Sequence, residues 1–119
     1  MLKKSLSSVQ IFYPKFNRSS IIQQIKDGVG NLDQKLPLTL IVLFGSYAKG
    51  NYSVSSDIDL MVIYKGEPKD NAYALVKKTL SITLLEPHVY SESEYEELKE
   101  TIDKMIKDGV IIYQNGRIV

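Results

Sequence analysis

The sequence contains no cysteine and no tryptophan among its 119 residues. The lack of cysteine excludes disulfide bonds, thiolate nucleophiles and cysteine-based zinc sites. An excess of charge of one sign is also missing, because 15 Lys and Arg residues face 14 Asp and Glu residues, which leaves a formal net charge of +1. Such a balance gives no strong field to collect nucleic acid, so a nucleic-acid partner is not expected.

Long hydrophobic runs are absent as well. The first five residues, Met1-Leu2-Lys3-Lys4-Ser5, include two lysines, but no continuous apolar stretch of signal-peptide length follows them. No segment is long and apolar enough to span a bilayer. We therefore expect a cytoplasmic protein that does not enter a membrane.

The composition that remains is ordinary for a globular protein, with 44% hydrophobic and 24% charged residues. The length lies in the range of one compact domain and is short for two. No internal repeat or low-complexity tract is present. We expect a single domain over residues 1–119.

Apolar residues at helical spacing predict three helices. The first covers residues 19–36, the second lies near residues 72–80, and the third follows residue 91. The third has an apolar face of Tyr95, Leu98, Ile102, Met105 and Ile106, and its glutamates suit a solvated face and a helix N-terminus. The expected caps are Ser19 or Ser20 for the first helix, Asp70 or Asn71 for the second, and a Ser91–Glu94 capping box for the third, which should stop at Gly109.

Continuous apolar runs predict buried strands between these helices. They cover residues 38–44, 58–64, roughly 82–90 and 110–113, and a turn is predicted at Asn115-Gly116. Because helices and strands alternate, we predict an α/β (α+β) fold, in which helices pack on one face of a mixed β-sheet.

The loop between the first two strands begins with Gly45-Ser46. A glycine at the end of a buried strand lets backbone N–H groups approach an anion closely, and a serine hydroxyl can donate to a phosphate oxygen. Taken alone, this pair would more readily be read as an ordinary strand-to-loop turn.

Two carboxylates, Asp57 and Asp59, follow at the start of the second apolar run. Residues two apart on a strand project from the same face, so both side chains can share one cation. Mg²⁺ suits such a pair because it takes oxygen ligands, keeps several waters and is completed by substrate phosphates. Two acids beside an apolar strand repel each other, and a bound cation removes that cost.

Gly45-Ser46, ten intervening residues and then Asp57-x-Asp59 together resemble the signature of the DNA polymerase beta-like nucleotidyltransferase superfamily. The sequence is most similar to the minimal members of this superfamily, the MNT domains that are antitoxin partners of HEPN-domain toxins. The resemblance covers nearly the whole chain in size and order of elements. Its specific part runs from residue 44 to residue 62.

The resemblance implies a nucleotide site and a metal site. Gly45 and Ser46 would bind the triphosphate, with Lys49 and Ser56 as further nucleotide-binding residues. Asp57 and Asp59 would ligate Mg²⁺ as catalytic residues, and a third carboxylate on a later strand would complete the set. Glu86 is the acidic candidate for this third position, although relatives usually carry aspartate. Lys49 stands where relatives often carry arginine, and it can neutralise a phosphate without bidentate contact.

The function implied by the resemblance is transfer of a nucleoside monophosphate, expected to be AMP from ATP, to a hydroxyl acceptor with release of pyrophosphate. The suggested acceptor is a side chain of a HEPN-type partner protein. The alternative is a weakly active or inactive module of the same fold that binds nucleotide or partner. A small-molecule modifier would need a further domain for its acceptor, and a polymerase would need a basic surface.

Three other residues near the motif have ordinary structural interpretations. His88 is the sole histidine. A lone histidine near a strand end is more often a hydrogen-bonded structural group than a base or a ligand. Tyr47 and Tyr52 could stack on a base, but such tyrosines more often pack against neighbours. The sequence leaves the oligomeric state open, as a homo- or hetero-oligomer.

Overall fold

The computed structural model describes residues 17–53 and 55–119. Among the helices in these two ranges, none has both the length and the apolar character needed to cross a membrane. In chain order the elements are α2 (Arg18–Lys35), β1 (Leu38–Phe44), α3 (Ser46–Lys49), β2 (Ile58–Tyr64), α4 (Ala72–Leu80), β3 (Leu85–Ser91), α5 (Glu92–Met105), β4 (Val110–Gln114) and β5 (Arg117–Ile118).

The strands form one mixed sheet in the order β3-β2-β1-β4-β5. β2 and β3 run parallel, whereas β1 pairs antiparallel with β2 and with β4, and β4 pairs antiparallel with β5. The predicted mixed sheet and α+β class are confirmed. The register places Asp59 between Phe44 of β1 and Glu86 of β3, so residues from three strands meet at one row of the sheet.

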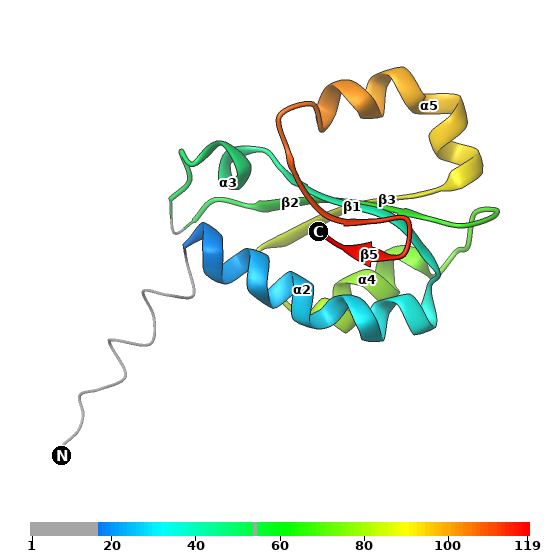
Figure 1. Ribbon diagram of the computed structural model, residues 1–119, viewed down its shortest axis with the longest axis horizontal. Helices are drawn as coiled ribbons and strands as arrows, with labels where there is room; N and C mark the ends of the chain where they lie inside the picture. Colours follow the sequence, from blue (N-terminus) through cyan, green and yellow to red (C-terminus); the bar gives the residue numbers. More distant parts are fainter. Residues whose placement is uncertain (1–16, 54) are drawn as a thin grey trace, which may run out of the picture.

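The helices divide between the two faces of the sheet (Figure 1). α2 and α4 cover one face, where Leu60 and Val62 of β2 join the main core. The prediction that helices pack on one face of the sheet holds for α2 and α4, but α5 lies over the opposite face. There Ile102 of α5 packs with Met61 and Ile63 of β2. Because Met61 and Ile63 alternate with the main-core residues, both faces of β2 are buried.

The caps of α2 and α5 explain where these helices begin. The prediction of Ser19 or Ser20 as the cap of α2 is wrong, because the Asn17 side chain occupies that role and accepts a hydrogen bond from the Ser20 backbone N–H at 2.7 Å. In α5 the predicted capping box is confirmed. The Glu94 N–H donates to Ser91 Oγ at 3.1 Å, and the Ser91 N–H donates to the Glu94 carboxylate at 2.9 Å.

The apolar face expected for α5 is interrupted at Leu98. This residue has non-helical angles, φ −108° and ψ 15°, and the helix bends there. Ile102 is buried, but Leu98 and Met105 are 43% and 37% exposed. The predicted apolar face is therefore not continuous, because the bend breaks the regular spacing on which the prediction rested.

Gly109 does not end α5, which stops at Met105. A Cβ atom at Gly109 would lie 2.8 Å from the carbonyl oxygen of Leu43, so glycine is needed where the chain passes close to β1. The prediction that Gly109 stops the helix is therefore wrong, and its role is to let the backbone pass close to β1.

Two predictions near strand ends have different outcomes. β3 starts at Leu85 instead of residue 82, because the chain first turns through Leu84 at φ 67°. The turn at Asn115-Gly116 is confirmed, since both residues have positive φ and link β4 to β5 in a two-residue hairpin.

Candidate active site

Gly45 is the point where β1 ends and α3 begins. Its backbone has φ 76° and ψ −151°, a conformation that is open almost only to glycine. A Cβ atom at this position would also collide with Oδ2 of Asp59. Both the backbone and the available space therefore require glycine, and the Asp59 carboxylate lies directly against the Gly45 backbone.

Asp59 has a second neighbour on its other oxygen. Oδ1 lies 3.3 Å from Nε2 of His88, and the two side chains are 29% and 30% exposed. The His88 ring also meets the Phe44 ring edge to face, with 5.0 Å between the ring centroids. Asp59 is thus held between Gly45 and His88, with part of its carboxylate facing solvent.

The two other predicted carboxylates lie near Asp59. Asp57 directly precedes β2 and is exposed, while the next residue, Ile58, is buried and donates its N–H to the Leu84 carbonyl at 2.8 Å. Glu86 is exposed on β3 at the position paired with Asp59. The strand pairing therefore brings Asp59 and Glu86 to neighbouring positions, with Asp57 two residues before Asp59.

The residues at this site fit a Mg²⁺ ion bound mainly by phosphate and water. Within residues 17–53 and 55–119, neither Asp57 nor Asp59 forms an ion pair with Lys or Arg. Oxygen donors that are partly open to solvent suit Mg²⁺, which usually uses one or two protein carboxylates. In the described part of the chain no group of three or more His, Asp or Glu side chains is arranged to hold a metal ion. The role of Glu86 as a third ligand stays a prediction.

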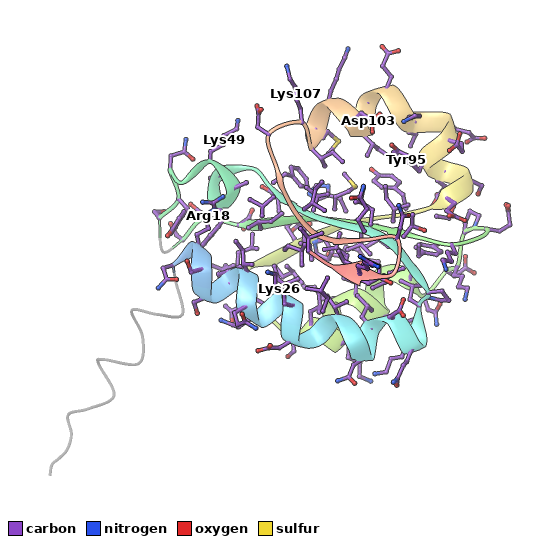
Figure 2. The ribbon with its side chains drawn as sticks, viewed as in Figure 1. Arg18, Lys26, Lys49, Tyr95, Asp103 and Lys107 are labelled. Atoms are coloured by element: carbon purple, nitrogen blue, oxygen red, sulfur yellow. The ribbon has the colours of Figure 1, made fainter. Side chains whose placement is uncertain are left out.

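The predicted nucleotide-binding residues differ in their surroundings. Ser46, half-buried, is the first residue of α3, next to the Gly45–Asp59 contact. Lys49 is exposed at the end of α3, and Figure 2 places it at the same end of the molecule as Arg18. Ser56 accepts a hydrogen bond from the Ser53 N–H at 2.9 Å, so its hydroxyl already stabilises the loop.

Tyr47 and Tyr52 stack on each other. Their ring centroids are 4.2 Å apart with 8° between the planes, and Tyr47 is fully buried. Burial raises the pKa of the Tyr47 phenol, and the charge of the neighbouring Tyr52 raises it further. The Tyr52 hydroxyl accepts the Arg18 N–H at 2.9 Å. This pair anchors α3 and its loop to the start of α2.

Residues 22–113 match the family described as a nucleotidyltransferase domain, a span that includes Gly45, Asp59 and Glu86. The chain belongs to this family. Over 48 residues, this nucleotidyltransferase domain is 38% identical to a candidate protein adenylyltransferase of Methanocaldococcus jannaschii. That match covers 40% of this chain and 48% of the relative, so it spans about half of the relative's length.

Solved structures share the fold of this nucleotidyltransferase domain. A candidate nucleotidyltransferase from Sulfolobus solfataricus has a TM-score of 0.60 and 22% identity over 97% of this chain and 94% of its own. A complex of a tri-AMPylated HEPN toxin with its MNT antitoxin, from Shewanella oneidensis, contains a chain with a TM-score of 0.52. That chain is 20% identical, with 79% of this chain and 73% of its own covered.

His88 is the site residue whose position the sequence reasoning missed. As a lone histidine it was expected to make a structural hydrogen bond, and the structure shows that its partner is Asp59. One signal was available, because Glu86 and His88 are two residues apart on a strand and so share a face. The residue of β2 that lies next to Glu86 and His88 is set by the pairing of β3 with β2, which the sequence did not show.

Proposed function

We propose that this nucleotidyltransferase domain transfers a nucleoside monophosphate, AMP from ATP, to a hydroxyl acceptor and releases pyrophosphate. The observation that carries the proposal is the contact of the Asp59 carboxylate with the Gly45 backbone. This contact joins the two halves of the motif, because it sets an acidic group beside the serine that follows the glycine. A phosphate bound at Ser46 would then lie next to a cation held by Asp59.

Each predicted site residue has a distinct role in this reaction. Ser46 donates its hydroxyl to a phosphate oxygen, and the exposed Lys49 neutralises phosphate charge. Asp57 and Asp59 would hold Mg²⁺, and Glu86 would accept the proton of the acceptor hydroxyl as its oxygen bonds to the α-phosphorus and pyrophosphate leaves. An ion held there would supply polarisation of the phosphate and a lower pKa of the attacking hydroxyl. Ser56 stays a proposed nucleotide contact that would have to leave its hydrogen bond with Ser53.

We infer that the acceptor is a hydroxyl on a HEPN-type partner protein. Two likenesses support this choice: the fold shared with a chain of a complex between an AMPylated HEPN toxin and an MNT antitoxin, and the local identity to a candidate protein adenylyltransferase. The near balance of charge also suits a protein acceptor better than a nucleic acid.

The double substitution Asp57→Asn with Asp59→Asn tests the metal site. We expect isothermal calorimetry with Mg²⁺ and a non-hydrolysable ATP analogue to show affinity lowered by more than about 100-fold, since loss of even an outer-shell partner commonly costs roughly 10- to 100-fold. The fold should stay intact or become slightly more stable, because two like charges are removed.

The matched control is Glu96→Gln with Glu97→Gln, which removes two charges from exposed positions of α5. It should bind the nucleotide as the unchanged protein does. Unaltered metal-dependent binding by the Asp57/Asp59 variant would show that the site has been assigned to the wrong residues.

A second candidate function is a module that binds nucleotide or partner without transferring AMP. One observation favours it: Glu86, next to Pro87, stands where the resemblance implies an aspartate. Incubation of the domain with ATP, Mg²⁺ and a HEPN-type protein, followed by intact-mass analysis, separates the two functions. Addition of AMP to the partner supports transfer, whereas nucleotide binding without an adduct supports the binding module.

A further inference from the structure

His88 and Asp59 are brought together by the parallel pairing of β3 with β2. In this register Asp59 pairs with Glu86 and Met61 pairs with His88, so His88 is diagonal to Asp59 on the same face of the sheet. Met61 is fully buried beneath α5, whereas Asp59 and His88 are both partly exposed. The imidazole therefore meets the carboxylate at the solvent-facing edge of this face.

The Asp59 carboxylate has a different neighbour on each oxygen. Oδ2 lies against the Gly45 backbone, and Oδ1 lies 3.3 Å from Nε2 of His88. An ionised carboxylate only accepts hydrogen bonds, so Nε2 must bear the proton in this contact. The carboxylate has about four lone-pair positions, and one donor leaves the others available to a cation.

The His88 ring is itself held in place by Phe44. The two rings meet edge to face with centroids 5.0 Å apart, and Phe44 is the register partner of Asp59 on β1. Three neighbouring strands thus restrict the rotation of a single carboxylate. Metal-ligating side chains are commonly oriented by such outer hydrogen bonds.

We propose that His88 is a positioning residue for the metal site of this domain. It donates from Nε2 to Oδ1 of Asp59, and this hydrogen bond sets the plane in which the carboxylate meets the ion. The inference rests on the proposed function, because it assigns to Asp59 the role of metal ligand. His88 itself touches neither the ion nor the nucleotide.

The test compares His88→Leu, which removes the donor, with His88→Gln, which keeps an N–H donor at a similar distance from the backbone. Electron paramagnetic resonance titration with Mn²⁺ and a non-hydrolysable ATP analogue measures the affinity of each variant. We expect His88→Leu to bind Mn²⁺ about tenfold more weakly, in line with the loss of an outer-shell partner. His88→Gln should recover most of the affinity.

Two results of the titration would overturn the inference while leaving the proposed function intact. The first is a His88→Leu variant that binds Mn²⁺ as tightly as the unchanged protein. The second is a His88→Gln variant as weak as His88→Leu, because the donor would then not be what matters. An unchanged protein that binds no Mn²⁺ with the nucleotide would instead contradict the proposed function.

Nuclear magnetic resonance tests, without any metal, whether His88 donates a hydrogen bond to Asp59. His88 is the sole histidine, so its imidazole gives one set of ring nitrogen signals. We expect the signals of the Nε2–H form in the unchanged protein and a clear change of the Nε2 shift in Asp59→Asn. Identical shifts in both proteins would overturn the inference.

Discussion

At the scale of single residues, the backbone of Gly45 determines how closely Asp59 can approach the end of β1. Two independent constraints apply there, a glycine-only backbone conformation and the position of Oδ2 of Asp59. Gly50, at the other end of α3, has a positive φ of 82° but no heavy atom within 4 Å of an added Cβ. The two glycines that flank α3 therefore differ in their contact with the site.

At this scale we predict that Gly45→Ala lowers both stability and nucleotide binding. The unfavourable backbone should cost about 1–3 kcal/mol of unfolding free energy, and the new methyl group would displace the Asp59 carboxylate. Gly50→Ala is the matched control, expected to cost roughly 1–2 kcal/mol for a left-handed residue without weaker binding. Chemical denaturation and calorimetry measure the two effects. Equal nucleotide affinity in both variants would contradict the importance of the Gly45–Asp59 contact.

At the scale of elements, α2 is a long helix that contains two glycines with different surroundings. Gly28 faces α4, and an added Cβ would lie 2.6 Å from Cδ2 of Leu80. Gly30 has nothing within 4 Å of an added Cβ and is exposed. The first glycine lets the two helices pack closely, whereas the second only weakens the helix.

We therefore predict opposite trends for alanine at these two positions. Gly30→Ala should raise the free energy of unfolding by about 0.8–1 kcal/mol, the difference in helix propensity between the two residues. Gly28→Ala gains the same propensity but must move the Leu80 side chain, so its net gain should be smaller or negative. Urea denaturation of both variants checks this order. A larger gain at Gly28 than at Gly30 would show that α2 and α4 are less tightly packed than the structure indicates.

At the scale of the whole molecule, the site is built on the middle of the sheet. Asp59 belongs to β2, which pairs with β1 on one side and β3 on the other, and β2 is buried on both faces. A ligand that binds Asp57 and Asp59 therefore contacts the central strand β2 directly. Binding should stabilise the entire fold and not only the loop.

The corresponding prediction is a rise in thermal stability with Mg²⁺ and a non-hydrolysable ATP analogue. Because the ligand binds only the folded protein, a ligand concentration 100 times the Kd adds about 2.7 kcal/mol to the free energy of unfolding. The Asp57→Asn, Asp59→Asn variant should show no such rise. Differential scanning calorimetry over a series of ligand concentrations measures the effect, and an increase that persists in the variant would place the bound nucleotide elsewhere.

Local patterns in the sequence were sufficient to predict most elements. β1 and β2 were predicted at residues 38–44 and 58–64, where the structure has them, because each is a continuous apolar run. The Ser91–Glu94 box and the Asn115-Gly116 turn were also predictable, since both depend on residues within one turn of each other. Errors arose at Leu98, where α5 bends, and at Gly109, where close approach to the distant strand β1 overrides the local helix-stop signal.

The sequence by itself determined the kinds of element, the glycine and serine at the end of β1, and the acids at the start of β2. These follow from residue type and short-range spacing, which act through backbone sterics and apolar periodicity. Only the tertiary structure decided that Asp59 lies between Gly45 and His88, and that α5 covers the face opposite α2 and α4. Those arrangements depend on which strands pair and in what register, and residues far apart in the chain set that choice together.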